Sequence, residues 1–497
     1  MAANTNTAIK DTARHGIVYG IGQLVPQLTG FVLLPLFTKY LTPSDFGVWS
    51  LLQSVSILAV TIFLVGLDTA CMRSFYDYDD DEKRKVVVGS TVILVSFMVL
   101  LLYIAGFTSD RTLSELVFKS RDYSRHIHLV VILSGVRILN SIPYIVFRAT
   151  NRSKTYILIQ SVSAVARFVL MIVFLFLFEQ KVVSLLYADI SVTTLSSAFL
   201  YLTVRSDIKL KLDLGEAKKM MLYGLPLAPG QISSSVFEIA DRYFLSAYAS
   251  LSAVGVYSVG IKLSQAVPLL LSRPFQLIFP AVAFSLHKDS GYLDYCKKIF
   301  TYYSLIGIFI CLSIGIFSRE ILSLLGRREY LAVENIIPFL LLSYFFHGVQ
   351  QNLQIGIFVE RKTHWFPIII GTGCALNILL NWLLIKDLQI YGCAIAKILS
   401  KLIIVLLWYF LSKKFMNIRY EWVRIIKIAA AASIVYALSR WIKFDILIAS
   451  IFFKIFLLVL FPLALYSVSF FVPDEKAKIK SIYRKATHAS LKLIFSR

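Results

Sequence analysis

The sequence predicts an all-α integral membrane protein with about fourteen transmembrane helices and a duplicated plan. Of the 497 residues, 58% are hydrophobic and 16% are charged, whereas soluble domains are nearer one half apolar and one quarter charged. Apolar runs of about 20 residues, enough to cross a bilayer as a helix, follow one another along the chain. A motif near residue 40 also returns near residue 248. Composition, run length and repetition together favour a multi-pass membrane protein.

Short polar segments separate the expected spans. The first span is interpreted as a retained helix and not a signal peptide, because it is long and carries no small-residue cleavage signature. In chain order, the spans are expected at 15–41, 43–66, 86–107, 126–147, 155–178, 182–204, 219–246, 250–282, 299–318, 333–358, 364–385, 389–412, 423–441 and 446–472.

The repeated motif divides the chain into two halves. Residues 40–50 read YLTPSDFGVWS and residues 248–258 read YASLSAVGVYS, sharing a tyrosine, Ser-x-x-Gly-Val, an aromatic residue and a serine. Repeated membrane halves with a site between them are a known transporter plan. We therefore expect an N-terminal lobe at 1–207, a cytoplasmic linker at 208–218, a C-terminal lobe at 219–412, two additional helices at 413–472 and a basic cytoplasmic tail at 473–497.

The net charge of +22 is compatible with nucleic-acid binding, but its distribution favours a membrane topology. With a cytoplasmic N-terminus, most Lys and Arg residues fall in inner loops and tails, as the positive-inside rule requires. Both termini are then cytoplasmic, and the tail lies along the anionic inner leaflet. The outer loop 108–125 departs from the rule because it carries Arg111, Lys119, Arg121 and Arg125. Membrane lipids, and no nucleic acid, are the expected partners.

No metal or cofactor site is expected. The five cysteines are scattered, so their spacing indicates neither a disulfide framework nor a zinc site. An acidic run at 77–82 lacks the glycine and the distal glutamate of a calcium loop, and we interpret it as a solvated loop. Coupling to a proton or sodium gradient remains open.

Charged residues inside the expected spans are the strongest indication of function. A charge at the bilayer centre costs about 2.5 to 3.5 kcal/mol, so most of these side chains must face protein or a wet cavity. Eight basic residues against three acids leave five surplus positive charges. The basic residues are Arg137, Arg167, Arg242, Lys262, Arg273, Lys397, Lys401 and Lys454, and the acids are Asp189, Glu238 and Asp241. An anionic ligand would satisfy the surplus.

Several of these charges also have structural interpretations. Glu238 precedes Arg242 by four residues, the favourable order for an intrahelical ion pair. Lys454 can snorkel from a helix end. Burial favours the neutral form of lysine, so a partly neutral state is an alternative for Lys262, Lys397 and Lys401.

Three arginines have no such alternative. Arg137, Arg167 and Arg273 have no acid three or four residues away in the same helix, and a guanidinium stays protonated. Arginine binds phosphate through two parallel hydrogen bonds. Gln23 and Gln27 lie four residues apart on one face of the first span, and such side-chain amides can form hydrogen bonds with sugar hydroxyls. These patterns predict a two-lobed transporter of a large anionic or amphiphilic solute.

Five motifs resemble one known family. They are YGLP at 223–226, DRYFL at 241–245, GVYS at 255–258, GLDTACMRSFY at 66–76 and YLTPSDFGVWSLL at 40–52. The chain resembles the polysaccharide-repeat (O-antigen, Wzx-type) flippases of the multidrug/oligosaccharidyl-lipid/polysaccharide (MOP) exporter superfamily. The resemblance implies two six-helix bundles related by a pseudo-two-fold axis along the membrane normal, in the V shape of the multidrug and toxin exporters, plus two C-terminal helices.

The resemblance also implies a function. Such a protein moves undecaprenyl-diphosphate-linked oligosaccharide from the cytoplasmic to the outer leaflet of the bacterial inner membrane by alternating access. The product serves O-antigen, and hence lipopolysaccharide, or capsule or exopolysaccharide synthesis, with the polymerase and chain-length machinery as further partners. It is a transporter and not an enzyme.

Residue roles follow from the same resemblance. A cationic cavity would hold the diphosphate and sugars through Arg137, Arg167, Arg273, Lys262, Lys397, Lys401 and Arg242. The resemblance assigns gating or ion coupling to Asp68 and Asp241, and a separate hypothesis of ion coupling also includes Asp189 and Glu238. For Asp68 and Asp241, ion pairs to Arg73 and Arg242 that fix helix ends are an equal alternative.

Three other functions fit the sequence less well. A drug exporter of the same fold would need surplus carboxylates for cationic drugs, whereas the surplus here is positive. An enzyme acting on lipid-linked sugars would need an acid–base or metal constellation in a substantial outer loop, and the longest outer loop, 108–125, is short. A membrane scaffold would leave the buried arginines unexplained.

Overall fold

The computed structural model describes residues 28–286, 291–360, 362, 364–416, 418–442, 444, 446–473 and 475–476. These residues form helices joined by short turns, with no β-strand among them, which confirms the expected fold class. Gln23, Gln27 and nearly all of the tail at 473–497 lie outside the described residues.

Eleven helices in this described part of the chain are long and apolar enough to cross a membrane. The helix α16 (Trp365–Phe415) joins two helices at Gln389, where a φ of 45° breaks the helical path. The apolar helix Leu28–Tyr40 is a shorter one. Each expected span overlaps a helix of the structure, and the protein is a multi-pass membrane protein.

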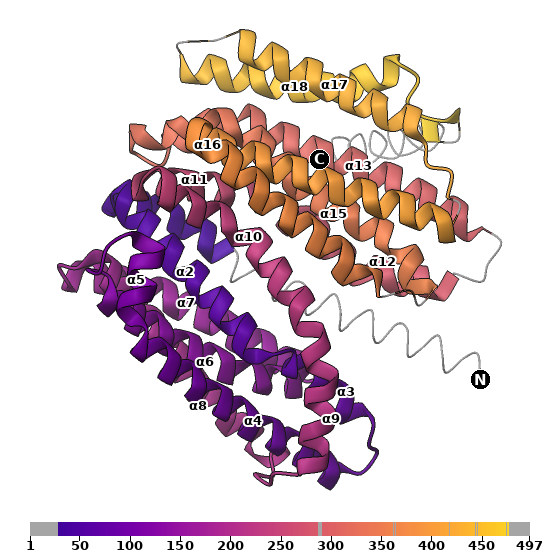
Figure 1. Ribbon diagram of the computed structural model, residues 1–497. Helices are drawn as coiled ribbons and strands as arrows, with labels where there is room; N and C mark the ends of the chain where they lie inside the picture. The colour runs from indigo at the N-terminus through magenta and orange to yellow at the C-terminus, as the bar shows by residue number, and fades with distance from the viewer. Residues whose placement is uncertain are drawn as a thin grey trace, which may run out of the picture. The chain divides into compact units, whose positions relative to one another are not determined.

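Contacts divide the described residues into two compact units. The first holds the described residues of 1–289 and 319–417, and the second holds those of 290–318 and 418–497. Figure 1 labels the main helices. Besides Leu28–Tyr40 and α16, the first unit holds α2 (Pro43–Leu64), α3 (Leu67–Tyr76), α4 (Asp81–Thr108), α5 (Asp110–Phe118), α6 (Ser124–Ala149), α7 (Ser153–Leu177), α8 (Lys181–Val204), α9 (Leu214–Gly224), α10 (Ala228–Tyr248), α11 (Leu251–Ser264), α12 (Arg273–Leu286) and α15 (Ile337–Val359).

Short helical turns complete this unit. They are η1 (Arg205–Asp207), η2 (Leu225–Leu227), the π-helical η3 (Pro268–Ser272) and η4 (Arg328–Ile336), while α14 (Ser318–Ser323) begins at the boundary of the two units.

The second unit consists of α13 (Tyr292–Ile316), α17 (Trp422–Trp441) and α18 (Leu447–Ser467). α17 packs on both α13 and α18. Arg424 on α17 donates hydrogen bonds to Glu421 at 2.9 Å and to Glu475 at 2.7 Å. Lys454 on α18 is buried in the protein. The expectation that its side chain snorkels from a helix end is therefore wrong.

α2 lies at the centre of the first unit, and its start is fixed by local sequence. The Asp45 amide donates to the Thr42 hydroxyl at 3.1 Å, and the Thr42 amide donates to the Asp45 carboxylate at 2.9 Å, a capping box. Pro43 follows at the first helical position, where a missing N–H costs nothing. α2 packs against α6 and α8 from the first half of the chain and α10 and α11 from the second.

The two copies of the repeated motif meet where α2 crosses α11. A Cβ atom on Gly47 would overlap the carbonyl oxygen of Leu251, and a Cβ atom on Gly255 would overlap that of Pro43. The two glycines hold equivalent places in the two motifs, and so do Pro43 and Leu251. The contact is therefore reciprocal, and only glycine allows the two backbones to come this close.

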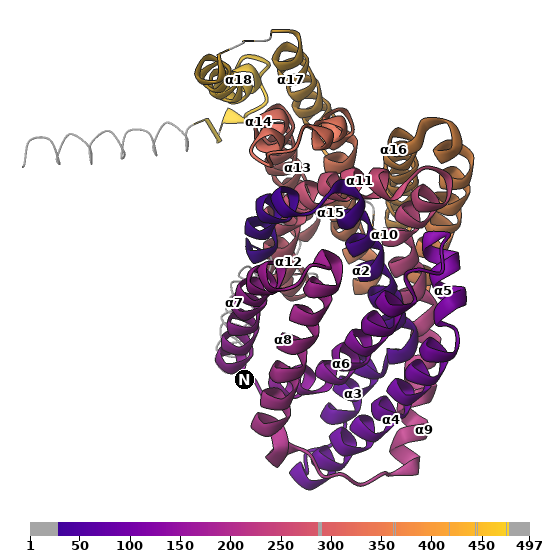
Figure 2. The same cartoon turned by 90° about the vertical axis from the view of Figure 1, so that its left-hand side faces the viewer.

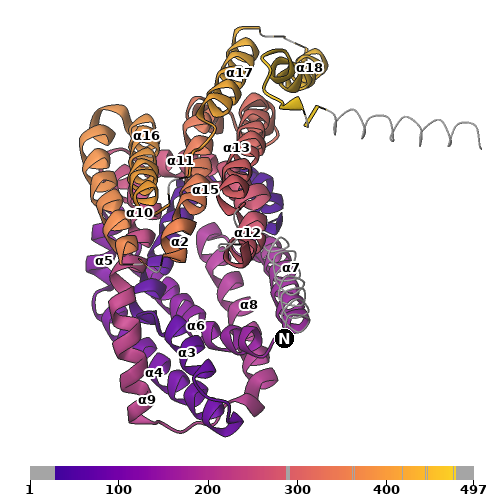
Figure 3. The same ribbon diagram turned by 90° about the vertical axis from the view of Figure 1, so that its right-hand side faces the viewer.

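α9 and α10 follow one another across the break at η2, which contains Pro226. α9 packs on α3 and α4, whereas α10 packs on α16 and α2. Figures 2 and 3 show α9 beside α4 and α10 beside α16. This path carries one strongly charged helix, α10, to the centre of the first unit.

The expected loop 108–125 contains a helix, α5. Its surplus of positive charge is partly compensated, because Arg121 pairs with Glu115 at 2.8 Å. Arg125 donates a hydrogen bond to the hydroxyl of Tyr187 at 2.8 Å. These partners show how the basic residues of this segment are accommodated.

Candidate functional site: a cationic cavity

A cavity of about 360 Å³ lies within the first unit. Helix Leu28–Tyr40, α2, α6, α7 and α8 from the first half of the chain line it together with α10 and α11 from the second. Its charged lining residues are Arg137, Arg167, Asp189, Arg242 and Lys262. Four cations against one carboxylate leave three net positive charges.

Arg137, Arg167 and Asp189 form one cluster in this cavity, from α6, α7 and α8. Arg137 Nη2 lies 2.7 Å from Asp189 Oδ2, and Arg167 Nε lies 2.9 Å from Asp189 Oδ1. The Asp189 side chain is 2% exposed, whereas those of Arg137 and Arg167 are 27% and 35% exposed. The carboxylate is therefore buried behind two guanidinium groups that face the cavity.

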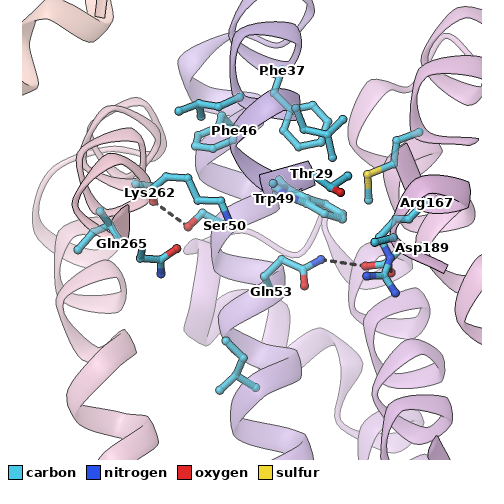
Figure 4. Close-up of a pocket in the computed structure, with 18 of the residues that line it drawn as sticks. Thr29, Phe37, Phe46, Trp49, Ser50, Gln53, Arg167, Asp189, Lys262 and Gln265 are labelled. Atoms are coloured by element: carbon cyan, nitrogen blue, oxygen red, sulfur yellow. Dashed lines mark hydrogen bonds and ion pairs between the residues drawn. The ribbon is translucent and has the colours of Figure 1, made fainter. Parts of the chain in front are cut away.

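α2 supplies the hydrogen-bonding partners of this cluster. Arg137 donates to Gln53 Oε1 at 3.0 Å and to Ser56 Oγ at 2.9 Å. Gln53 donates in turn to Asp189 at 3.5 Å. Figure 4 shows Gln53 between the two walls of the cavity, with a dashed line to Asp189. One polar side chain of α2 thus holds both an arginine and its counterion.

Arg242 and Lys262 lie on the side of the cavity built by α10 and α11. Arg242 Nη1 donates to Ser54 Oγ at 2.9 Å, and its buried Nε has no hydrogen-bond partner in the part of the chain that the structure describes. Lys262 extends toward Gly30, where a Cβ atom would come within 3.3 Å of Nζ. Among the described residues, no carboxylate forms an ion pair with either cation.

Aromatic and small polar residues complete the lining. Phe37, Phe46 and Trp49 are buried in the cavity wall, and the Phe37 ring packs edge-on against Trp49. Ser258 donates to Ser50 at 2.7 Å, joining the last serines of the two repeated motifs. The cavity therefore has an aromatic wall as well as cationic ones.

Lys397 and Lys401 do not line this cavity. They lie on α16 in a separate cluster with two acids of α10, in which the two lysines and Asp241 are buried and the Glu238 side chain is 39% exposed. Lys397 Nζ is 2.9 Å from Asp241, which also accepts a hydrogen bond from the Tyr257 hydroxyl at 2.6 Å. Lys401 Nζ is 3.2 Å from Glu238. Two cations and two acids leave this cluster with no net charge.

Two expected ion pairs are not formed among the described residues. Glu238 contacts Lys401 and not Arg242, because α16 brings lysines closer than the next turn of α10 does. Arg242 donates to the Asp241 carboxylate through its backbone amide, at 2.9 Å, and not through its guanidinium group. The same carboxylate binds the Lys397 ammonium group. The intrahelical interpretation of Arg242 is therefore wrong.

Two other candidates lie apart from both clusters. Arg273 is exposed at the start of α12 and does not line the cavity. Asp68 is half-buried on α3 and accepts a hydrogen bond from Thr69 at 3.3 Å. Its expected partner Arg73 stacks instead on the Tyr223 ring, 4.4 Å from the centroid, so the expected Asp68–Arg73 pair is also wrong.

Sequence reasoning did not single out Trp49, Gln53 or Ser50 as site residues, although all three line the cavity. Trp49 and Ser50 belong to the repeated motif, and that repetition was the available signal. Gln53 lies four residues after Trp49 in the same helix. A polar residue on that face of a membrane helix is a signal for a wet or protein-lined environment.

Comparison with known proteins identifies the family. The profile of the polysaccharide biosynthesis protein family matches residues 12–285, more than half of the chain. The chain belongs to this family. No match was found among curated protein sequences.

Solved structures identify the fold. The lipid II flippase MurJ, in an inward closed conformation, aligns with a TM-score of 0.76 at 14% identity, covering 91% of this chain and 99% of that one. An inward-facing multidrug resistance MATE family transporter of the MOP superfamily aligns with a TM-score of 0.65 at 13% identity, covering 80% and 97%. A MOP superfamily transporter from Pyrococcus furiosus, described as having a binding pocket of reverse polarity, aligns with a TM-score of 0.59 at 14% identity, covering 81% and 95%.

These comparisons confirm the predicted family and fold. This chain has the fold of the MOP superfamily transporters to which it was compared. The family model thus gives the family, and the solved structures give the fold.

Proposed function

We propose that this polysaccharide biosynthesis family member is a flippase for undecaprenyl-diphosphate-linked oligosaccharide repeat units. It moves them from the cytoplasmic to the outer leaflet of the bacterial inner membrane for O-antigen, capsule or exopolysaccharide synthesis. The observation that carries this proposal is the net charge of the cavity, with four cations against one carboxylate. A buried surplus of this size is costly unless an anion compensates it.

A diphosphate diester suits this cavity chemically. It carries two negative charges and several acceptor oxygens, which guanidinium groups bind in a bidentate manner. Amide and hydroxyl groups of Gln53, Ser50 and Gln265 line the same cavity and can bind sugar hydroxyls. The Trp49 ring offers a flat apolar face to a sugar.

Within this proposal, the residues fall into distinct roles. Arg137, Arg167, Arg242 and Lys262 bind the substrate, because they line the cavity. Glu238 and Asp241, paired with Lys397 and Lys401, are the acids to which we assign ion coupling, since they lie on α10, which packs on α16 of the second half and on α2 of the first. Asp68 lies at the start of α3, next to the interruption between α2 and α3 at Gly66, where a gating role fits better than substrate contact.

The remaining expectations belong to the same proposal. The lobes at 1–207 and 219–412 alternate in opening the cavity to either side, with both termini cytoplasmic. The polymerase and chain-length machinery then receive the flipped lipid. A MATE-type drug exporter is the second candidate on grounds of fold, but a surplus of positive charge repels the organic cations that such exporters carry.

The proposal is tested by transfer of a labelled undecaprenyl-diphosphate oligosaccharide across proteoliposomes that contain the purified protein. A cationic dye is tested in parallel. Lipid transfer without dye transport is the expected result. Dye transport without lipid transfer would overturn the proposal and favour the exporter. Arg148→Gln is a matched control for cavity variants, because Arg148 lies on α6, as Arg137 does, but is exposed.

A further inference from the structure

The four cations of the cavity form two pairs with different net charges. Arg137 and Arg167 share Asp189 at 2.7 and 2.9 Å, so this group carries one net positive charge. Arg242 and Lys262 have no carboxylate partner among the described residues, so this group carries two. The cavity is thus a place for two anionic groups of unequal charge.

The two groups lie on different sides of α2. Figure 4 shows Lys262 on one side of this helix and Arg167 with Asp189 on the other, with Trp49 and Gln53 between them. The two groups are also built by different helices, α6, α7 and α8 against α10 and α11. A single diphosphate bound by Arg242 and Lys262 therefore leaves the other positive group uncompensated.

We infer that the oligosaccharide itself carries a carboxylate, as a uronic acid does, and that Arg137 and Arg167 read this group. The inference rests on the proposed function and specifies its substrate class. The charges match: two on a diphosphate diester face Arg242 and Lys262, and one on a uronate faces the group with one net positive charge. Trp49 and Gln53, between the two groups, then contact the intervening sugar.

Asp189 makes the group of Arg137 and Arg167 selective for a carboxylate over a phosphate. Without it, two adjacent guanidinium groups would carry two charges and would suit a second phosphate as well as a carboxylate. Asp189 lowers the net charge to one and holds both guanidinium groups in place through its two oxygens. Arg167 Nε lies close to Asp189 but is not aligned for a hydrogen bond. The contact with Arg167 Nε is therefore mainly between charges, while Arg167 Nη2 donates a hydrogen bond to Thr193 Oγ1 at 3.5 Å.

The test compares three labelled undecaprenyl-diphosphate disaccharides in proteoliposomes. One is neutral with two glucose units, one has glucuronate as its first sugar and one has glucuronate as its second. We expect one acidic lipid to be flipped about tenfold faster than the neutral one, since a hydrogen bond between charged groups contributes at this level. Equal rates for all three lipids would overturn the inference and leave the flippase proposal standing. No transfer of any lipid would instead count against the flippase proposal itself.

Variants test whether Arg137 and Arg167 bind the carboxylate of the sugar. Arg167→Gln and Arg137→Gln should bring the acidic lipid down to the rate of the neutral lipid, whereas Arg167→Lys keeps the charge and should retain part of the preference. Arg242→Gln should slow both lipids alike, because both carry the diphosphate. Arg148→Gln should change neither rate. An acidic preference that survives in both Arg137→Gln and Arg167→Gln would contradict the assignment to these residues.

Discussion

The first unit holds two charge clusters that differ in their balance and in their access to the cavity. On α6, α7 and α8, two arginines share one carboxylate, and their side chains are 27% and 35% exposed. Between α10 and α16, two lysines meet two carboxylates, and the lysine side chains are 1% and 7% exposed. The first cluster lines the cavity and the second does not.

The comparison shows that a charge in a membrane helix is informative only together with its partners. In a balanced buried cluster the charges compensate one another, so no anionic ligand is needed, although removing one member leaves a buried charge unpaired. An unbalanced cluster that reaches a cavity needs an anion from outside. Removing a lysine from the balanced cluster should therefore lower stability, whereas removing an arginine that reaches the cavity should mainly slow transport.

The largest effect on stability is expected at Lys397. Lys397→Met leaves Asp241 buried without its ammonium partner, and breaking a buried pair in this way costs about 3 to 5 kcal/mol. Thermal unfolding of the purified protein in detergent should show a much lower Tm than the wild type. Adding Asp241→Asn removes the unpaired charge and should restore part of the loss. An unchanged Tm in Lys397→Met would mean that the pair does not hold α10 against α16.

The largest effect on transport is expected at Arg242. Arg242→Ala removes one of the two cavity cations that have no carboxylate partner among the described residues and should slow lipid transfer by about tenfold to a hundredfold, the range for hydrogen bonds to charged groups. Its Tm should change little, because no ion pair is broken. Arg242→Lys should recover part of the rate. Wild-type transfer by Arg242→Ala, with Arg148→Ala as the matched control, would rule out a substrate role.

A smaller and mixed effect is expected at Asp189. Asp189→Asn leaves Arg137 and Arg167 without a counterion, but both reach the cavity, where water or a ligand can compensate. We expect a loss of about 1 to 3 kcal/mol, less than for Lys397→Met, together with a change in lipid preference. Tm and lipid transfer measured on the same preparation test this. A larger drop in Tm than in Lys397→Met would reverse the comparison.

The smallest effect is expected at Glu82, which makes ion pairs at 2.9 Å with both Lys85 and Lys209. The Glu82 and Lys209 side chains are more than half exposed and that of Lys85 is 35% exposed, and exposed pairs contribute little to stability. Glu82→Gln should leave both Tm and lipid transfer at wild-type values. A clear drop in Tm would show that the number of ion pairs, and not their burial, sets the response of this protein.

The fold could be predicted from the sequence because it depends on features that lie within each segment. Apolar runs of bilayer length place the spans, and the repeated motif predicts two similar halves. The charged residues of the spans could also be identified, since a charge stands out against an apolar background. The helical nature of 108–125 was missed, because α5 has no bilayer-length apolar run.

The partners of those charges could not be predicted, because they come from other helices. Asp189 is 52 positions from Arg137 in the sequence, and Lys397 is 156 positions from Asp241. Spacing within one helix favoured Glu238 with Arg242, whereas α16 supplies Lys401 instead. Local spacing therefore identified charged residues of which several line the cavity, but it paired them wrongly, and it favoured Arg273, which is exposed, over Arg242.

The crossing of α2 and α11 also constrains how halves of related proteins can be exchanged. Gly47 clears a carbonyl from the second half, and Gly255 clears one from the first. A chimera that takes one half from a relative inherits only one of these glycines from this chain. It can assemble only when the donor also has a residue without a side chain at the matching place. The two halves are therefore not independent modules, and exchange of glycan specificity is better attempted within one half, at the α6–α8 wall.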